Sequence, residues 1–146
     1  MTIPISVETP VFTYKILQQP ADMPTMIWLT RNTVTQYRYA AEHGCIGLLA
    51  HSWMAGKLFP LLTIGQSVEI ASDDGAVREF TACQIRRFKA LDPYNPYSQF
   101  IDLDSGGEMS STDVFMAVYS GDQVTFETCL TLDNNPVSGR LFVIAK

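Results

Sequence analysis

The chain has 146 residues, which is the size of one domain. Hydrophobic residues make up 47% and charged residues 17%, which excludes a disordered segment and supplies a full core. The net charge of −5 argues against nucleic acid and anionic membranes as partners, because both select basic surfaces. We therefore expect one domain over residues 1–146.

No segment of the sequence has the pattern of a membrane-spanning or secretory signal segment. The longest stretch without Asp, Glu, Lys or Arg is residues 43–56, which is shorter than the roughly 18 apolar residues of a spanning helix. Residues 1–5 lack the basic and apolar regions of a signal peptide. We expect a soluble chain with no membrane span, and the sequence leaves its cellular compartment undecided.

The first predicted element is a helix after residue 33. Thr33 and Gln36 have the spacing of a capping box, Tyr37 and Ala41 share one helical face, and Gly44 suits the C-terminal cap. An apolar, strand-like run then leads to His51.

The remaining elements are predicted to be mostly short strands separated by turns. Residues 73–75, Asp-Asp-Gly, are typical of a hairpin turn. The expected strands are residues 67–70, 77–91, 113–119, 123–130 and 141–145. Many strands with one helix favour a mainly β fold, either a barrel or a sandwich. The long connection 92–112 is expected to be a functional loop.

The sequence contains three cysteines, an odd number, and no C-x-x-C pair. Neither a disulfide framework nor a zinc site is therefore the favoured interpretation. In the predicted strand 123–130, alternation places Cys129 with Thr125 and Glu127, on the face opposite the apolar side chains. This placement indicates a reactive thiol, although a buried structural cysteine stays an alternative. Cys83, in the middle of strand 77–91, is interpreted as a core-filling residue.

A nucleophilic cysteine needs a base or a cation beside it. His51 follows a predicted strand, from which its ring can project into a site. Arg140 begins the last apolar strand, and the hairpin that joins this strand to the preceding one is expected to set it near Cys129. A guanidinium in that place can stabilise an oxyanion.

The order His51, then T-x-T-C ending at Cys129, then Arg140 before an apolar strand resembles the sortase family of cysteine transpeptidases. The segment after His51 and the segment 85–93 are also similar to that family. Two positions depart from its pattern, with Ala50 in place of glycine and Phe126 in place of leucine. The resemblance covers residues 46–145.

This resemblance implies a closed β-barrel of about eight strands with one or two short helices. Cys129 would attack an LPxTG-like sorting peptide, His51 would act as acid and base, and Arg140 would hold the oxyanion. The thioester would pass to an amine or to water. Leu49, Glu127 and Thr128 would contact the substrate, and the loop 92–112 would close over it. The family also implies a cell-surface location and cell-wall anchoring of surface proteins.

Two other functions stay open at this point. His43, Gly44, Cys45 and Ile46 resemble the S-H-G-C-I-R signature of L,D-transpeptidases, with Cys45 as the nucleophile, but Glu42 and Gly47 replace its serine and arginine. A non-catalytic sortase-fold protein that binds peptides or serves as a scaffold is the other alternative.

No cofactor is expected. Calcium is the one ion with candidate ligands, at Asp102, Asp104 and Glu108. Their spacing is not that of an EF-hand loop, so a solvated acidic loop is the favoured interpretation.

Overall fold

The computed structural model describes residues 2–146. Its strands are β1 (Pro4–Glu8), β2 (Thr13–Gln18), β3 (Thr33–Gln36), β4 (Ile46–Leu49), β5 (Ser67–Ser72), β6 (Val77–Ala90), β7 (Phe100–Asp102), β8 (Glu108–Met109), β9 (Val124–Leu132) and β10 (Asn135–Ala145). The helices are α1 (Arg38–Glu42), α2 (Ser111–Val118) and the 3₁₀ helix η1 (Ala55–Leu61).

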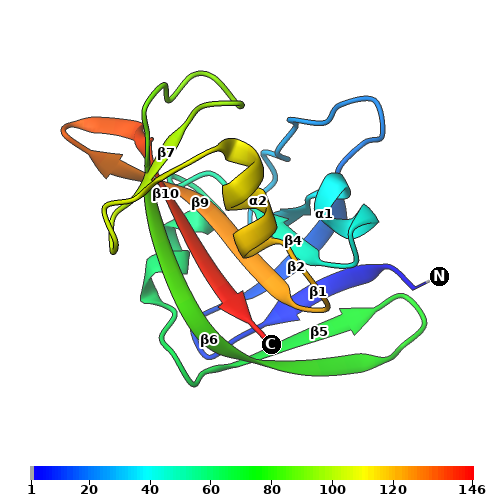
Figure 1. The fold of residues 1–146 in the computed structure, drawn as a ribbon. Coiled ribbons are helices and arrows are strands. Elements are labelled where there is room, and N and C mark those ends of the chain that lie inside the picture. The colour runs from blue at the N-terminus through cyan, green and yellow to red at the C-terminus, as the bar shows by residue number, and fades with distance from the viewer. Residues whose placement is uncertain (1) are drawn as a thin grey trace.

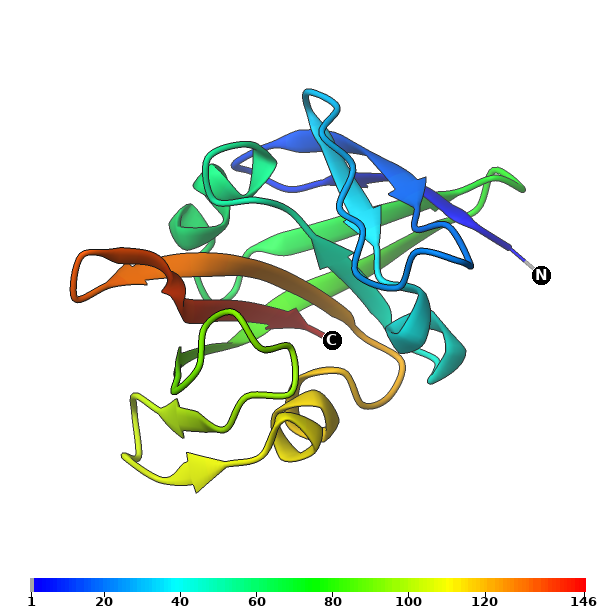
Figure 2. The same ribbon diagram turned by 90° about the horizontal axis from the view of Figure 1, so that it is seen from above.

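Eight of these strands close into a barrel, as predicted (Figure 1). The strand order is β10-β9-β4-β3-β2-β1-β5-β6, and the pairing of β10 with β6 closes the ring. The long strand β6 makes this possible because its first part pairs with β5 and its middle with β10. Its last residues pair with β7, so that β7, β8 and α2 lie together outside the barrel (Figure 2).

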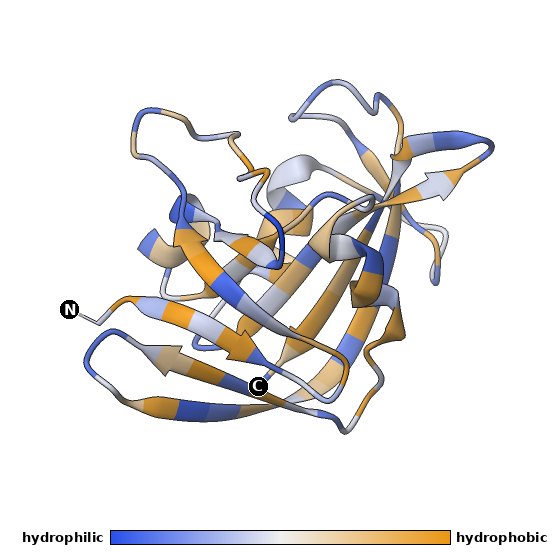
Figure 3. Ribbon diagram, turned by 180° about the vertical axis from the view of Figure 1, so that it is seen from behind, coloured by the Kyte–Doolittle hydropathy of each residue, from blue (hydrophilic) through white to orange (hydrophobic). Residues whose placement is uncertain are grey.

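Two apolar clusters hold the fold together. The first fills the barrel, where alternate residues of the strands point inward; polar and apolar residues alternate along the strands in Figure 3. The second lies between α2 and the outer surface of the barrel and includes Val114, Val118, Phe88 and Phe142. The outer face of β9 and β10 is therefore partly covered by α2.

The predicted helix after residue 33 is wrong over its first half. Residues 33–36 form β3, which pairs with β2 in parallel and with β4 in antiparallel fashion. All four residues are buried, and Val34 packs inside the barrel. Only the short α1 is helical, and Gly44 follows it with a φ of +79°.

The predicted strand at 113–119 is also wrong, since α2 occupies this segment. The Ser110 side chain accepts a hydrogen bond from the backbone N–H of Asp113 at 3.0 Å, and the Asp113 carboxylate accepts one from the Ser110 N–H. This reciprocal capping box begins the helix. Val114 and Val118, four residues apart, then form its buried face.

The other predicted strands are confirmed: β10 begins at Asn135, six residues before the predicted start at 141, and the other strands differ from the prediction by one or two residues at an end. The turn at residues 73–75 contains Gly75 at a φ of +86°, and β9 and β10 are joined by a tight turn at Asp133 and Asn134, both with positive φ. The loop 92–112 is partly ordered by β7 and β8. Cys83 is exposed on the outside of β6, so its interpretation as a core residue is wrong. Within residues 2–146 no helix combines the length and the apolar character that crossing a membrane requires.

Candidate functional site

The outward-facing residues of β4, β9 and β10 form lateral rows across the sheet. Cys129 on β9 is the direct partner of Arg140 on β10, as the sequence predicts. On the other side, β4 pairs in parallel with β9 up to Leu49 opposite Glu127, and the Ala50 N–H donates to the Glu127 carbonyl at 3.2 Å. His51 follows two residues after the end of β4, so the chain leads from this pairing toward Cys129. Cys129 and Arg140 thus lie in one row on neighbouring strands, which lie about 4.8 Å apart, and the chain after β4 leads toward this row.

The Cys129 thiol is partly buried on the outer face of β9. This confirms the predicted alternation, because Val124 and Phe126 of the same strand pack inside the barrel. Burial raises the pKa of the Cys129 thiol, the positive charge of Arg140 lowers it, and the negative charge of Glu127 raises it. The thiol is therefore mostly protonated at neutral pH.

The His51 ring is half-buried at the end of β4, and burial lowers its pKa. The ring stacks on Trp53, with centroids 5.2 Å apart and planes inclined by 16°. The part of the chain that the structure describes shows no hydrogen bond between the His51 ring and Cys129.

The Arg140 guanidinium is held by backbone carbonyls. It donates to the carbonyl of Val137, to that of Gly139 at 3.0 Å, and to that of Pro93 at 3.4 Å. The last bond connects it with the loop 92–112, so that loop contacts the row of site residues. Three neutral acceptors fix the guanidinium in position, and among residues 2–146 no carboxylate lies at hydrogen-bond distance from it.

Sequence reasoning missed a tyrosine that covers this face. The Tyr119 hydroxyl, at the end of α2, donates a hydrogen bond to the Glu127 carboxylate, two residues before Cys129. Burial raises the pKa of Glu127, which the Tyr119 bond and Arg140 oppose. Burial and the neighbouring carboxylate raise the pKa of Tyr119 well above its ordinary value. The contact is missed because the sequence reasoning predicts a strand over 113–119, where the structure has α2.

Glu127→Gln is expected to make Cys129 more reactive. The substitution removes a negative charge that raises the thiol pKa, so more thiolate is present at pH 7 and alkylation by iodoacetamide should be severalfold faster. The same change at the exposed Glu79 of β6 is the control. An unchanged or slower alkylation rate at Cys129 would contradict the assignment of Glu127 as a neighbouring charge.

Two of the three residues expected to contact substrate are buried. Leu49 is 9% exposed and Thr128 is 3% exposed, so neither offers side-chain surface to a ligand in this structure, whereas Glu127 is half-buried. The Thr128 hydroxyl has no hydrogen-bond partner within residues 2–146. A Cβ atom at Gly56 would lie 2.3 Å from this hydroxyl and 2.8 Å from the His51 carbonyl. Gly56 therefore lets the segment after His51 pack closely on β9.

Thr128→Val is expected to stabilise the protein. An unpaired buried hydroxyl costs about 1–3 kcal/mol, and valine has the same shape without that cost. A gain of about 1 kcal/mol corresponds to a rise of roughly 3 °C in melting temperature for a chain of this length. Calorimetry measures it, and a lowered melting temperature would show that the hydroxyl is paired in solution.

The alternative nucleophile Cys45 does not have the surroundings of a reactive thiol. It is 1% exposed, its Sγ lies 3.5 Å from the Gln123 carbonyl, and burial raises its pKa to about 11. His43 is turned away, with Nδ1 2.8 Å from the Tyr39 carbonyl. The structure gives the L,D-transpeptidase interpretation no support.

The acidic loop does not assemble a calcium site. Within the described residues, no three His, Cys, Asp or Glu side chains gather as metal ligands would. The Asp102 carboxylate instead pairs with Arg86 at 2.8 Å and accepts the backbone N–H of Asp104. These partners hold its pKa below its ordinary value against the effect of burial.

No protein-family model and no curated protein matches the sequence. The fold is nevertheless similar to solved sortases over nearly the whole chain. Listeria monocytogenes sortase A matches with a TM-score of 0.60 and 12% identity, covering 99% of this chain and 86% of that one. Sortase C from Clostridium perfringens SM101 matches with a TM-score of 0.57 and 15% identity, covering 98% of this chain and 68% of that one. Streptococcus agalactiae sortase C1 matches with a TM-score of 0.56 and 18% identity, covering 99% of this chain and 66% of that one. The chain has the sortase fold and spans about two thirds of the length of these two sortase C chains.

Proposed function

We propose that the protein is a sortase-like cysteine transpeptidase in which Cys129 is the nucleophile, His51 the acid and base, and Arg140 the oxyanion stabiliser. The observation that carries the proposal is the register of β9, which pairs Cys129 directly with Arg140 and continues its pairing with β4 toward His51. A thiol, an imidazole and a guanidinium on adjacent strands are the three groups that acyl transfer by a cysteine needs.

In the first half-reaction, the Cys129 thiolate attacks a peptide carbonyl carbon, and the S–C bond forms. The tetrahedral intermediate collapses with breakage of the C–N bond, and imidazolium at His51 gives its proton to the departing amine. In the second half-reaction, an amine or a water molecule attacks the thioester and transfers its proton to His51. The S–C bond breaks and the thiolate is restored.

The protonation states shape the expected rate. Burial raises the pKa of Cys129 and lowers that of His51, so the neutral thiol and neutral imidazole predominate at pH 7. The reactive pair of thiolate and imidazolium is then a minor form. The charge of Arg140, which is constant at working pH, favours the thiolate.

The substrates that fit this proposal are a peptide or protein with an LPxTG-like sorting motif and an amine acceptor. The likeness to sortases supports this substrate class, and a cell-surface location with anchoring to the cell wall follows from it as part of the same proposal.

Mass spectrometry of the protein incubated with a library of LPxTG-like peptides tests the proposal. We expect an acyl adduct on Cys129 and release of the C-terminal part of the peptide. An adduct that maps to Cys45, or binding of peptides with neither adduct nor cleavage, would overturn it in favour of the L,D-transpeptidase or the binding-scaffold alternative respectively.

A further inference from the structure

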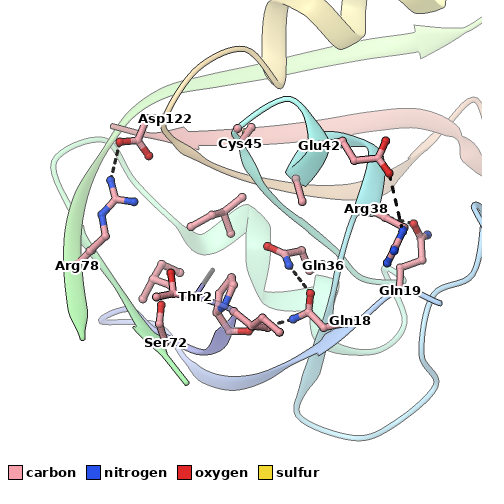
Figure 4. Close-up of a pocket in the computed structure, with 16 residues that line it drawn as sticks. Thr2, Gln18, Gln19, Gln36, Arg38, Glu42, Cys45, Ser72, Arg78 and Asp122 are labelled. Carbon is pink, nitrogen blue, oxygen red and sulfur yellow. Dashed lines mark hydrogen bonds and ion pairs between the residues drawn. The ribbon is translucent and has the colours of Figure 1, made fainter. Parts of the chain in front are cut away.

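A cavity of about 600 Å³ opens at the end of the barrel away from Cys129. It lies between α1, the beginning of β1, the end of β5 and the segment before β9 (Figure 4). This volume is in the range of small-molecule sites, and mouths of barrels are common places for them. No step of the proposed reaction uses this cavity.

The position of the cavity separates it from the row of site residues. Asp122 lines it, whereas Cys129 lies seven residues further along the chain, and a strand of that length spans about 23 Å. In Figures 1 and 2 the turn between β9 and β10 and the helix α1 lie at opposite ends of the barrel.

A relay of two glutamines ends inside the cavity. The Gln18 side-chain nitrogen donates to the Pro4 carbonyl at 3.1 Å, and the Gln36 side-chain nitrogen donates to the Gln18 side-chain oxygen. The direction of this relay is determined by Pro4, because a backbone carbonyl only accepts. Gln18 must turn its NH₂ group toward Pro4, and Gln36 must turn its NH₂ group toward Gln18.

The side-chain oxygen of Gln36 is therefore left facing the cavity (Figure 4). Gln36 is only 7% exposed, and within residues 2–146 this oxygen accepts no hydrogen bond. The oxygen is reached by solvent through the cavity, since Thr128 Oγ1 is the one enclosed side-chain atom without a partner in residues 2–146. A ligand that supplies an N–H or O–H group would take the place of water at this acceptor.

The other residues that line the cavity indicate whether the rest of such a ligand is apolar or charged. Ile46 and Ile70 contribute apolar walls. The charged residues at the mouth are paired with one another, Arg78 with Asp122 at 2.7 Å and Arg38 with Glu42 at 3.9 Å. A charged ligand would thus meet four charged side chains that are already paired with one another.

From these contacts we propose that the cavity binds a neutral ligand with an apolar body and a carboxamide-type N–H donor, anchored by the side-chain oxygen of Gln36. The site is independent of Cys129, so the inference holds whether or not the protein is a transpeptidase.

Two nearly isosteric probes test it, benzamide, which carries N–H donors, and acetophenone, which has a methyl group instead. Each is titrated into the ¹⁵N-labelled full chain, and shifts of backbone and glutamine side-chain amides are followed by NMR. We expect saturable shifts at the side-chain NH₂ groups of Gln36 and Gln18. Benzamide should bind about 3–10-fold more tightly than acetophenone, which is the worth of one hydrogen bond.

Gln36→Met removes the acceptor at similar size and should abolish the preference for benzamide, whereas Gln84→Met, on the exposed face of β6, should keep it. Ala41→Trp, on α1 at the cavity wall, should block both probes and serves if Gln36→Met does not fold. Equal affinity for the two probes, shifts confined to residues around His51, or no saturable shift would each overturn the proposal.

Discussion

Cys129→Ala should abolish the acyl adduct and lower peptide cleavage by at least about 10⁴-fold, since loss of the nucleophile removes covalent catalysis. The thiol lies on the outer face of β9 beside Arg140, and its substitution leaves the inward-facing residues of the strand untouched. The fold should therefore persist, and circular dichroism with thermal unfolding checks that it does. The measurement is the rate of peptide cleavage together with intact-protein mass after incubation with peptide.

The other two cysteines provide matched controls for this result. Cys83→Ala changes an exposed thiol on β6 and should leave both activity and stability near those of the parent. Cys45→Ala changes a buried thiol and should lower stability while the acyl adduct on Cys129 persists. Unchanged cleavage by Cys129→Ala would refute the assignment of the nucleophile.

The part of the site on β9 and β10 could be predicted from the sequence because alternation in a strand is strict. Val124 and Phe126 had to face the core, and this placed Cys129 outward without any knowledge of the rest of the fold. The tight turn at Asp133 and Asn134 then paired Cys129 with Arg140. Local chemistry determined both features.

Two elements were wrongly predicted because local signals competed. Thr33 and Gln36 have the spacing of a capping box, but burial of this β-branched segment between β2 and β4 outweighs it. The true capping box, at Ser110 and Asp113, was overlooked in a segment with strand-forming residues. Its signal was present, since Val114 and Val118 follow with helical spacing.

The cavity at the far end of the barrel had no signal in the sequence. Gln18, Gln36 and Asp122 come from distant parts of the chain and approach only when the barrel closes. The polar relay of Gln18 and Gln36 depends on the parallel pairing of β2 with β3, in which these two residues are direct partners. Parallel pairings of this kind are set by the whole fold and not by a local turn.

The orientation of the His51 ring could not be predicted from the sequence. The pairing of β4 with β9 ends at Leu49, two residues before His51, and the His51 ring stacks on Trp53. The proposed function therefore expects His51 to meet Cys129 in the complex with substrate, since catalytic hydrogen bonds often tighten only there.

Arg140→Ala is expected to lower the rate of acylation by about 10²–10³-fold, the usual cost of losing one oxyanion donor. The loss should fall on kcat and on kcat/KM equally, because the interaction forms in the transition state. A second effect adds to it. Without the positive charge that lowers the pKa of Cys129, less thiolate is present, and alkylation by iodoacetamide at pH 7 should slow down.

Arg140→Lys separates these two contributions. Lysine keeps the charge, so the alkylation rate should return toward that of the parent, but it lacks the planar fork that the carbonyls of Gly139 and Pro93 hold in place, so acylation should stay impaired. Arg87→Ala, at an exposed arginine of β6 opposite Leu141, is the control for loss of a positive charge near β10. If the rate of acylation by Arg140→Ala were within twofold of that of the parent, the guanidinium would serve only to hold the loop at Pro93. The oxyanion would then need another hydrogen-bond donor.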